Sequence, residues 1–302
     1  MEMFNRKVLN PRIGRLKKSK NLDILEQIEG YVIRKCSERD IEHSYDVMAE
    51  EMPYFKTMGY TEFATSFIMQ PLNTRMRNEQ MIDAWNHDVK KPDDWKSYLV
   101  KNIVEKDANK YQDRQQDFDR WPAKDYLVVL PGSNKVKSNI CLNRLRFLKK
   151  EHGDNVYFKP HPITTHQIVG EFKDFFGESC VLPRHMDVYY YLQKAKTVYT
   201  THISESALYA AVLGKRIEPI DIWNNILMGS FACINNHLFV NQHHLGDYIN
   251  KCFSSYKSGI VNPLIDKDWK GKIDKYFDYI CEKRDGYKNW YIAGPKKKPI
   301  KK

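Results

Sequence analysis

The chain has 302 residues, of which 42% are hydrophobic and 29% are charged, enough for one large domain or two ordinary ones with a real core. No run of about 18 apolar residues occurs, and the basic N-terminus lacks the apolar stretch of a secretory signal, so we expect neither a transmembrane span nor export. The six cysteines are scattered without a CxxC pair, which argues against a zinc knuckle or a disulfide framework and favours free thiols in a reducing cytoplasm.

The formal net charge of +11 is concentrated at the two ends of the chain. Residues 1–20 carry a net charge of +6 and residues 296–302 (KKKPIKK) carry +5, so residues 21–295 are neutral overall. Basic arms of this kind suit a polyanion, either nucleic acid or an anionic membrane surface. A solubilising tail without a partner is the alternative.

The first part of the chain, residues 21–120, is rich in helix formers and acids. Gly, Pro and N-cap signals divide it into expected elements. These are a helix that breaks at Gly30, a short strand over 31–35, a helix that starts near Ser37 and ends at Pro53, and a long polar helix within 92–120. Trp121-Pro122 then indicates a domain boundary near residue 122.

From Tyr126 the pattern changes to short apolar runs that alternate with amphipathic segments and are separated by Gly and Pro. The predicted strands are 126–130, 156–159, 180–182, 197–201 and 216–220, and the predicted helices are 140–150, 167–176, 188–194 and 205–213. Such alternation indicates an α/β fold, a parallel sheet with helices on both faces. Residues 265–292 are expected to form one or two further helices.

Polar residues follow the predicted strands where each strand ends. They are Gly132, Ser133 and Lys135 after the first, His161 after the second, Arg184 and His185 after the third, Thr201, His202 and Ser204 after the fourth, and Asp221 after the fifth. Ligands of open α/β sheets bind outside the carboxyl ends of the strands. Backbone N–H groups at turns and helix starts, with a lysine or a protonated histidine, predict a phosphate or pyrophosphate site.

Each of these features also has an ordinary structural reading, since PHP (160–162) can be a stiff turn and Ser204 an N-cap. The chain lacks GxGxxG and GxxxxGK[ST], so neither a nicotinamide fingerprint nor a Walker loop is supported. It also lacks an acidic cluster and an HExxH spacing, so we expect no metal site.

The segment 126–221 resembles the donor domain of GT-B glycosyltransferases, in particular the capsule-polysaccharide, sialyl- and glycerophosphotransferase branches. The motifs that carry the resemblance are KPHP (159–162), a strand that leads into Ser204 at a helix start, and ALYAAVLGK (207–215). By this resemblance His161 and Ser204, with Ser206 as neighbour, contact the donor phosphate. The family's glutamate that holds the ribose falls at Tyr209, so either Glu205, one turn earlier, replaces it or that contact is lost.

The resemblance implies two Rossmann-like domains of the GT-B type, with a helix-rich acceptor domain over 1–122, a donor domain over 123–264, and C-terminal helices and a basic tail over 265–302. It implies a nucleotide-sugar co-substrate, expected to be UDP-linked, and no metal or other cofactor. Lys135, His161, Arg184 and Ser204 would stabilise the leaving diphosphate. An inverting enzyme also needs a general base, and the candidates are Asp40, His43, Asp46, Glu50 and Asp88.

The acceptor is suggested by the basic arms. Phages make GT-B enzymes that place glucose or arabinose on 5-hydroxymethylcytosine in DNA, and we expect double-stranded DNA as the partner here, in the host cytoplasm if a phage encodes the chain. One alternative is a capsule or teichoic-acid type glycosyl- or glycerophosphotransferase held on the inner membrane face. Another is a non-catalytic nucleotide- or DNA-binding protein with a transferase fold.

Overall fold

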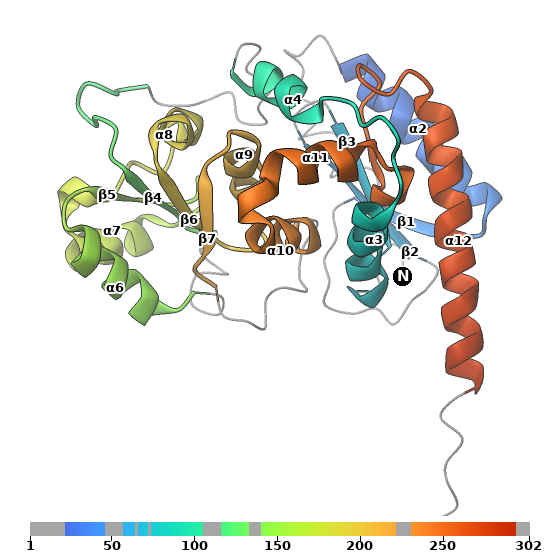
Figure 1. Ribbon diagram of the computed structural model, residues 1–302. Coiled ribbons are helices and arrows are strands. Elements are labelled where there is room, and N and C mark those ends of the chain that lie inside the picture. Colours follow the sequence, from blue (N-terminus) through green and yellow to red (C-terminus); the bar gives the residue numbers. More distant parts are fainter. Residues whose placement is uncertain are drawn as a thin grey trace, which may run out of the picture.

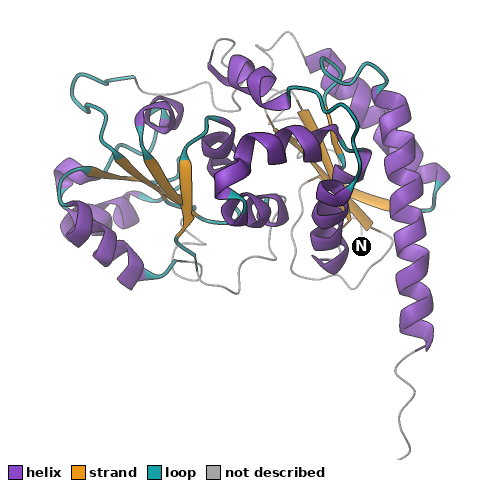
Figure 2. Cartoon of the chain, in the orientation of Figure 1, coloured by secondary structure: helices purple, strands orange, loops and turns teal. Residues whose placement is uncertain are grey.

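The computed structural model describes residues 22–45, 57–63, 66–71, 74–104, 116–132, 140–221 and 231–293 (Figure 1). The fold is mixed α/β, with two separate four-stranded sheets and helices packed around them (Figure 2). The described helices are α2 (Leu22–Glu38), α3 (Thr74–Asn86), α4 (Trp95–Val104), α6 (Leu142–His152), α7 (His166–Phe176), α8 (Val188–Lys194), α9 (Glu205–Val212), α10 (Ala232–Val240), α11 (Leu245–Ser254) and α12 (Trp269–Ala293). The strands are β1 (Glu42–Tyr45), β2 (Thr57–Phe63), β3 (Ser66–Pro71), β4 (Tyr126–Val129), β5 (Val156–Lys159), β6 (Thr197–Thr200), β7 (Arg216–Pro219) and β8 (Ile260–Val261).

The second sheet confirms the predicted parallel arrangement, with strand order β5-β4-β6-β7 and every pair parallel. Leu127 and Val129 point to the face covered by α8 and α9, whereas Val128 and Phe158 point to the face covered by α6 and α7. Because both faces are covered, the inner strands β4 and β6 are buried along almost their whole length, and β4 forms a continuous apolar run in the sequence.

The strand predicted over 180–182 is wrong. Glu178–Cys180 forms a 3-10 turn, named η1, after Gly177 ends α7 with a φ of 88°. Only Val181 joins the sheet, through a single parallel bridge to Phe158. The chain therefore touches the free edge of β5 for one residue and then leaves toward Arg184.

The first sheet has the order β1-β2-β3-β8, with β1 and β2 parallel and the other pairs antiparallel. The sequence did not predict it. The expected break at Gly30 and the strand over 31–35 are wrong, because α2 runs through both. Its apolar stripe of Ile28, Val32 and Cys36 is fully buried, whereas Gly30 lies on the exposed face. Burial of that stripe outweighs the cost of about 1 kcal/mol for a helical glycine.

Two further predictions for the first part fail in the residues that can be described. Where a helix was expected from Ser37, the structure has the last residues of α2, a turn at Asp40 with a φ of 51°, and then β1. Residues 46–53 of that prediction lie outside the described residues. The long helix within 92–120 is limited to α4, and 116–120 form turn and coil, while 105–115 are again not described.

The C-terminal part of the chain returns to the first sheet (Figure 1). β8 pairs with β3, and α12 packs along α2, where the hydroxyl of Tyr31 donates to Asp274 at 3.0 Å. One continuous hydrophobic cluster contains Phe63 and Trp95 from the first part together with Leu127 and Tyr209 from the second. Among the helices that can be described, none is sufficiently long and apolar for a membrane span.

Candidate functional site

The strand order gives the parallel sheet a topological switch point, the place where successive connections run to opposite sides of the sheet. From β4 the chain moves to β5 on one side, and from β6 it moves to β7 on the other, while β4 and β6 are neighbours. Ligands of open α/β sheets bind outside the carboxyl ends of the strands at such a switch point. The residues that follow β4, β5, β6 and β7 are therefore the candidate site.

The turn from β6 to α9 is held in one conformation by hydrogen bonds. Ser204 is the N-cap of α9, and its hydroxyl accepts from the N–H of Ser206 at 3.2 Å. From α10, the side-chain amide of Asn235 donates to the carbonyls of His202 and Ser204 at 2.6 and 2.8 Å. The cap and the amide fix the N-terminal turn of α9, whose backbone N–H groups and dipole favour an anion.

His202 is oriented by a buried carboxylate. Asp221 lies two residues after the end of β7, and its side chain is fully buried. Its carboxylate accepts from the backbone N–H and from the ring Nδ1 of His202, both at 2.8 Å. The ring edge also packs against Phe239 at 4.7 Å between centroids. Because Nδ1 faces a carboxylate it carries the proton, so Nε2 is the nitrogen left to meet a ligand.

The KPHP segment presents the second histidine. The N–H of Ile163 donates to Nδ1 of His161 at 3.3 Å, and the N–H of Thr164 donates to the carbonyl of His161 at 2.9 Å. In the neutral ring Nδ1 is therefore an acceptor and Nε2 carries the proton, the reverse of His202. The prolines on both sides limit the backbone, so a half-buried N–H donor is held just beyond β5.

Arg184 reaches the same region from the loop before α8. Its Nη1 donates to the carbonyl of Thr164 at 3.1 Å, and its own carbonyl accepts from Nζ of Lys159 at 2.7 Å. Lys159 also donates to the carbonyl of Pro160 at 2.7 Å. Burial lowers the pKa of Lys159 to about 7, and Asp187 opposes the shift only in part.

Several buried polar atoms around this edge have no hydrogen-bond partner among the residues that the structure describes. They are Oγ1 of Thr164, Thr200 and Thr201 and Oδ1 of Asn235. Buried polar atoms are nearly always satisfied in folded proteins, so a group of them calls for a partner such as water or a ligand. Their concentration next to His161, His202 and Ser204 supports a polar ligand at this edge.

The other predicted residues fall in different places. Gly132 is buried just after β4, and Glu205 and Ser206 are half-buried in the first turn of α9. Ser133, Lys135, Asp46 and Glu50 lie outside the described residues, as do both basic arms. Asp40 precedes β1, His43 is an exposed residue of β1, and Asp88 follows α3. None of these last three shares a described contact with the edge, so a general base stays a prediction.

The position at which the resemblance expects a glutamate faces the core. The ring of Tyr209 packs against Phe63 at 4.6 Å and against Tyr189 at 4.7 Å between centroids, and its exposed fraction is 1%. A carboxylate there would be buried between the two sheets. Glu205, one turn earlier on the same face of α9, is nearer the edge.

Sequence reasoning left Lys159 and Asn235 out of the site and named Asp221 only as a residue after the fifth strand, without a role. Asp221 had a signal, since it directly follows the last strand of the sheet. Asn235 had none, because it acts from α10, a helix that the sequence patterns did not predict. Lys159 was interpreted as the end of a strand, although a lysine at the end of an otherwise apolar strand can turn inward to a paired position.

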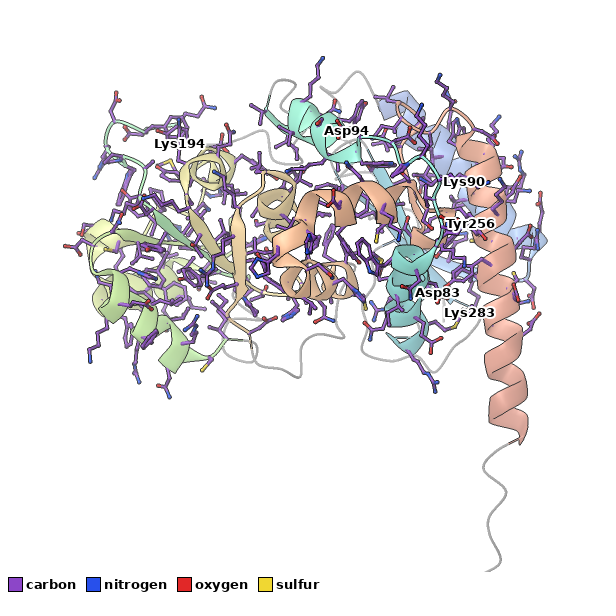
Figure 3. All side chains as sticks on the ribbon, in the orientation of Figure 1. Asp83, Lys90, Asp94, Lys194, Tyr256 and Lys283 are labelled. Carbon is purple, nitrogen blue, oxygen red and sulfur yellow. The ribbon has the colours of Figure 1, made fainter. Side chains whose placement is uncertain are left out.

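A different hollow lies between α3 and α12, with a volume of about 510 Å³. Two of its charged residues, Lys283 and Asp83, pair with each other, with Nζ of Lys283 at 2.7 Å from the carboxylate (Figure 3). The hydroxyl of Tyr279 also donates to Asp83 at 2.8 Å. The described residues hold no group of three or more His, Cys, Asp and Glu arranged for a metal ion. The carboxyl edge of the parallel sheet therefore remains the better candidate.

Comparison with known proteins gives no family or relative. No protein-family model, no curated protein and no solved structure matches the chain. Function therefore has to be argued from the geometry of the edge and from the motifs.

Proposed function

We propose that the chain is a metal-independent glycosyltransferase that binds a nucleotide-diphosphate sugar at the carboxyl edge of the parallel sheet. The observation that supports it is that His161 and Arg184 beyond β5, and His202 and the Ser204-capped start of α9 beyond β6, lie at the carboxyl edge of the same parallel sheet. The KPHP and GK motifs lie in the segment that resembles the GT-B donor domain, whose two-domain arrangement is part of the proposal.

The edge offers the donors that departure of a diphosphate requires. The acceptor hydroxyl gives its proton to a general base and its oxygen attacks the anomeric carbon, while the bond to the diphosphate oxygen breaks and that oxygen leaves with the electron pair. In this proposal the N–H of His161, the guanidinium of Arg184 and the N–H groups at the start of α9 stabilise the charge that develops there. The proposal assigns to Glu205 the contact with the ribose hydroxyls.

Transfer is tested by incubating the protein with a panel of nucleotide sugars and with DNA that contains plain or hydroxymethylated cytosine, followed by mass spectrometry of the nucleosides. Addition of a hexose or pentose mass to the modified nucleoside supports the proposal. If no sugar reaches any acceptor while the nucleotide still binds, a non-catalytic nucleotide-binding protein replaces it.

We propose hydroxymethylated cytosine in double-stranded DNA as the acceptor, and a cytoplasmic site of action, because the basic arms 1–20 and 296–302 match a polyanion. A mobility shift with duplex DNA should weaken steeply as salt rises and should disappear when both arms are deleted. Failure to bind duplex DNA at low salt would contradict this acceptor. Co-sedimentation with anionic vesicles instead would favour a surface-polysaccharide or teichoic-acid type transferase on the membrane face.

A further inference from the structure

His202 and Asp221 form an imidazole–carboxylate pair at the switch point of the parallel sheet. His202 lies in the turn between β6 and α9, beside the neighbouring strand β4, and Asp221 follows β7. The two oxygens of the carboxylate act separately, because Oδ2 accepts from the backbone N–H of His202 and Oδ1 accepts from its ring Nδ1, both at 2.8 Å. The pair therefore fixes the main chain and the ring of His202 together.

The second ring nitrogen of His202 is not used by the fold. Nε2 is hydrogen-bonded to no residue that the structure describes, and 7% of the side chain remains exposed. The carbonyl of His202 accepts from the side-chain amide of Asn235 at 2.6 Å, and the ring packs against Phe239. Because the backbone N–H, the carbonyl, Nδ1 and one side of the ring are all held, the direction of Nε2 is set before a substrate arrives.

Three buried polar atoms at the same turn also lack a hydrogen-bond partner within the described part of the chain. They are Oγ1 of Thr200 and of Thr201, which directly precede His202, and Oδ1 of Asn235. Asn235 is joined to this turn through its own amide nitrogen. Buried polar atoms are nearly always satisfied, so this group calls for a polar partner at the turn, such as water or a substrate hydroxyl.

The pair has the chemistry of a proton acceptor. A neutral imidazole whose Nδ1–H is held by a carboxylate carries its lone pair on Nε2. When Nε2 takes a proton, the carboxylate stabilises the imidazolium without being protonated itself. The side chain of Asp221 has no exposed surface, so water screens this attraction little. The candidates for a general base from the sequence lie in the first part of the chain, whereas this pair belongs to the parallel sheet.

We propose that His202 is the general base of the transfer and that Asp221 is its positioning residue. This inference deepens the proposed function and rests on it for the identity of the hydroxyl. Nε2 of His202 takes the proton of the acceptor hydroxyl, and the oxygen forms the bond to the anomeric carbon. The bond from that carbon to the diphosphate oxygen breaks, and its electron pair leaves on the diphosphate. The imidazolium then gives its proton to solvent, which restores the neutral ring.

The test measures kcat and KM for transfer from a nucleotide sugar to DNA that contains hydroxymethylated cytosine. His202→Gln should lower kcat by about 100-fold or more and change KM for the nucleotide sugar by less than about threefold. Asp221→Asn should lower kcat in the same way, because the imidazole loses the partner that fixes its tautomer. Added imidazole should restore part of the activity of His202→Ala, which a merely structural role of the ring would not allow.

His152→Gln is the matched control. The side chain of His152 is also 7% exposed, and its Nε2 pairs with the hydroxyl of Tyr199 at 3.0 Å. Its ring stacks on Tyr126, the first residue of β4, and so lies toward the amino end of the sheet. The same substitution there should leave kcat within about twofold of the wild-type value.

A second measurement needs no sugar transfer. Diethyl pyrocarbonate acylates an imidazole nitrogen that has a lone pair and is open to solvent, and mass spectrometry of peptides locates the modified histidines. His202 should react about tenfold faster than His152, and this advantage should be lost in Asp221→Asn. Circular dichroism shows which variants are folded, and imidazole rescue of His202→Ala carries the test if Asp221→Asn does not fold.

The outcomes separate the base from the transferase. Wild type that transfers sugar while folded His202→Gln keeps its kcat within about threefold overturns the inference and leaves the glycosyltransferase in place. Wild type that transfers no sugar from any donor refutes the glycosyltransferase. In that case slow acylation of His202 overturns the pair as well, whereas fast acylation that depends on Asp221 supports a proton acceptor that serves another hydroxyl.

Discussion

Replacing Asp221 by Asn should destabilise the carboxyl edge by a measurable amount. The carboxylate accepts two hydrogen bonds from His202, each at 2.8 Å, and its side chain has no exposed surface. Asparagine keeps one acceptor oxygen but turns an NH₂ group toward the second donor. The loss of one charge-assisted hydrogen bond costs about 1.5–3 kcal/mol. For a chain of this size such a loss lowers the melting temperature by roughly 5 °C.

The assay is urea denaturation followed by circular dichroism, with thermal melting as a second measurement. Asp154→Asn is the matched control, because Asp154 pairs with Lys149 at 2.8 Å but is 86% exposed, so its midpoint should not change. His202→Gln in the Asp221→Asn background should cost less than the sum of the single changes. A midpoint for Asp221→Asn that equals the wild-type value would refute the view that this carboxylate holds the imidazole.

Three further outcomes are expected. Burial lowers the pKa of Lys159 from 10.5 to about 7, so between these pH values the unfolded chain binds one more proton at this residue than the folded chain. The free energy of unfolding should therefore rise with pH across this window, by on the order of 4 kcal/mol. Denaturation of Lys159→Met at pH 7 and pH 10 should lack that rise. Tyr209→Glu should lower the free energy of unfolding by about 3 kcal/mol or more in urea, since it buries a carboxylate against Phe63; a neutral effect would mean that the position opens to water. His161→Ala should reduce donor turnover by well over tenfold with an unchanged circular dichroism spectrum, and an unchanged rate would remove His161 from the site.

The parallel sheet could be predicted because its information is local. The inner strand β4 is covered on both faces and forms an apolar run, and Gly153 and Gly177, with positive φ, mark where α6 and α7 end. Once the strands are placed, their carboxyl ends follow, and so do His161 and Ser204. The prediction for 180–182 was wrong because this segment has the apolar composition of a short strand, although only Val181 forms a bridge to the sheet.

The first sheet could not be predicted in this way. β3 pairs with β8, which lies almost two hundred residues later in the chain, and no local pattern encodes that partner. The helix α2 was divided at Gly30 because a glycine was given more weight than the buried stripe of Ile28, Val32 and Cys36. Here tertiary burial overrides local propensity.

The residues predicted to face a ligand follow from the ends of the strands, whereas the residues that support them could not be predicted from the sequence. Lys159 and Arg184 are separated by 25 residues and His202 and Asn235 by 33, and each pair meets only through the fold. The sequence shows that a lysine ends β5, but the direction of its side chain depends on the carbonyl of Arg184. Supporting contacts of this kind require the three-dimensional structure because their partners come from other elements.

The same contacts explain how the edge is held rigid. α9 carries Ser204 at its start, and Tyr209, one turn further along, is packed between Phe63 of the first sheet and Tyr189 of α8. Asn235 holds the turn before α9 from the opposite side. Large apolar contacts between parts of a chain limit their relative motion. An anion that reaches the start of α9 therefore meets N–H groups already fixed in place, and binding does not have to order them.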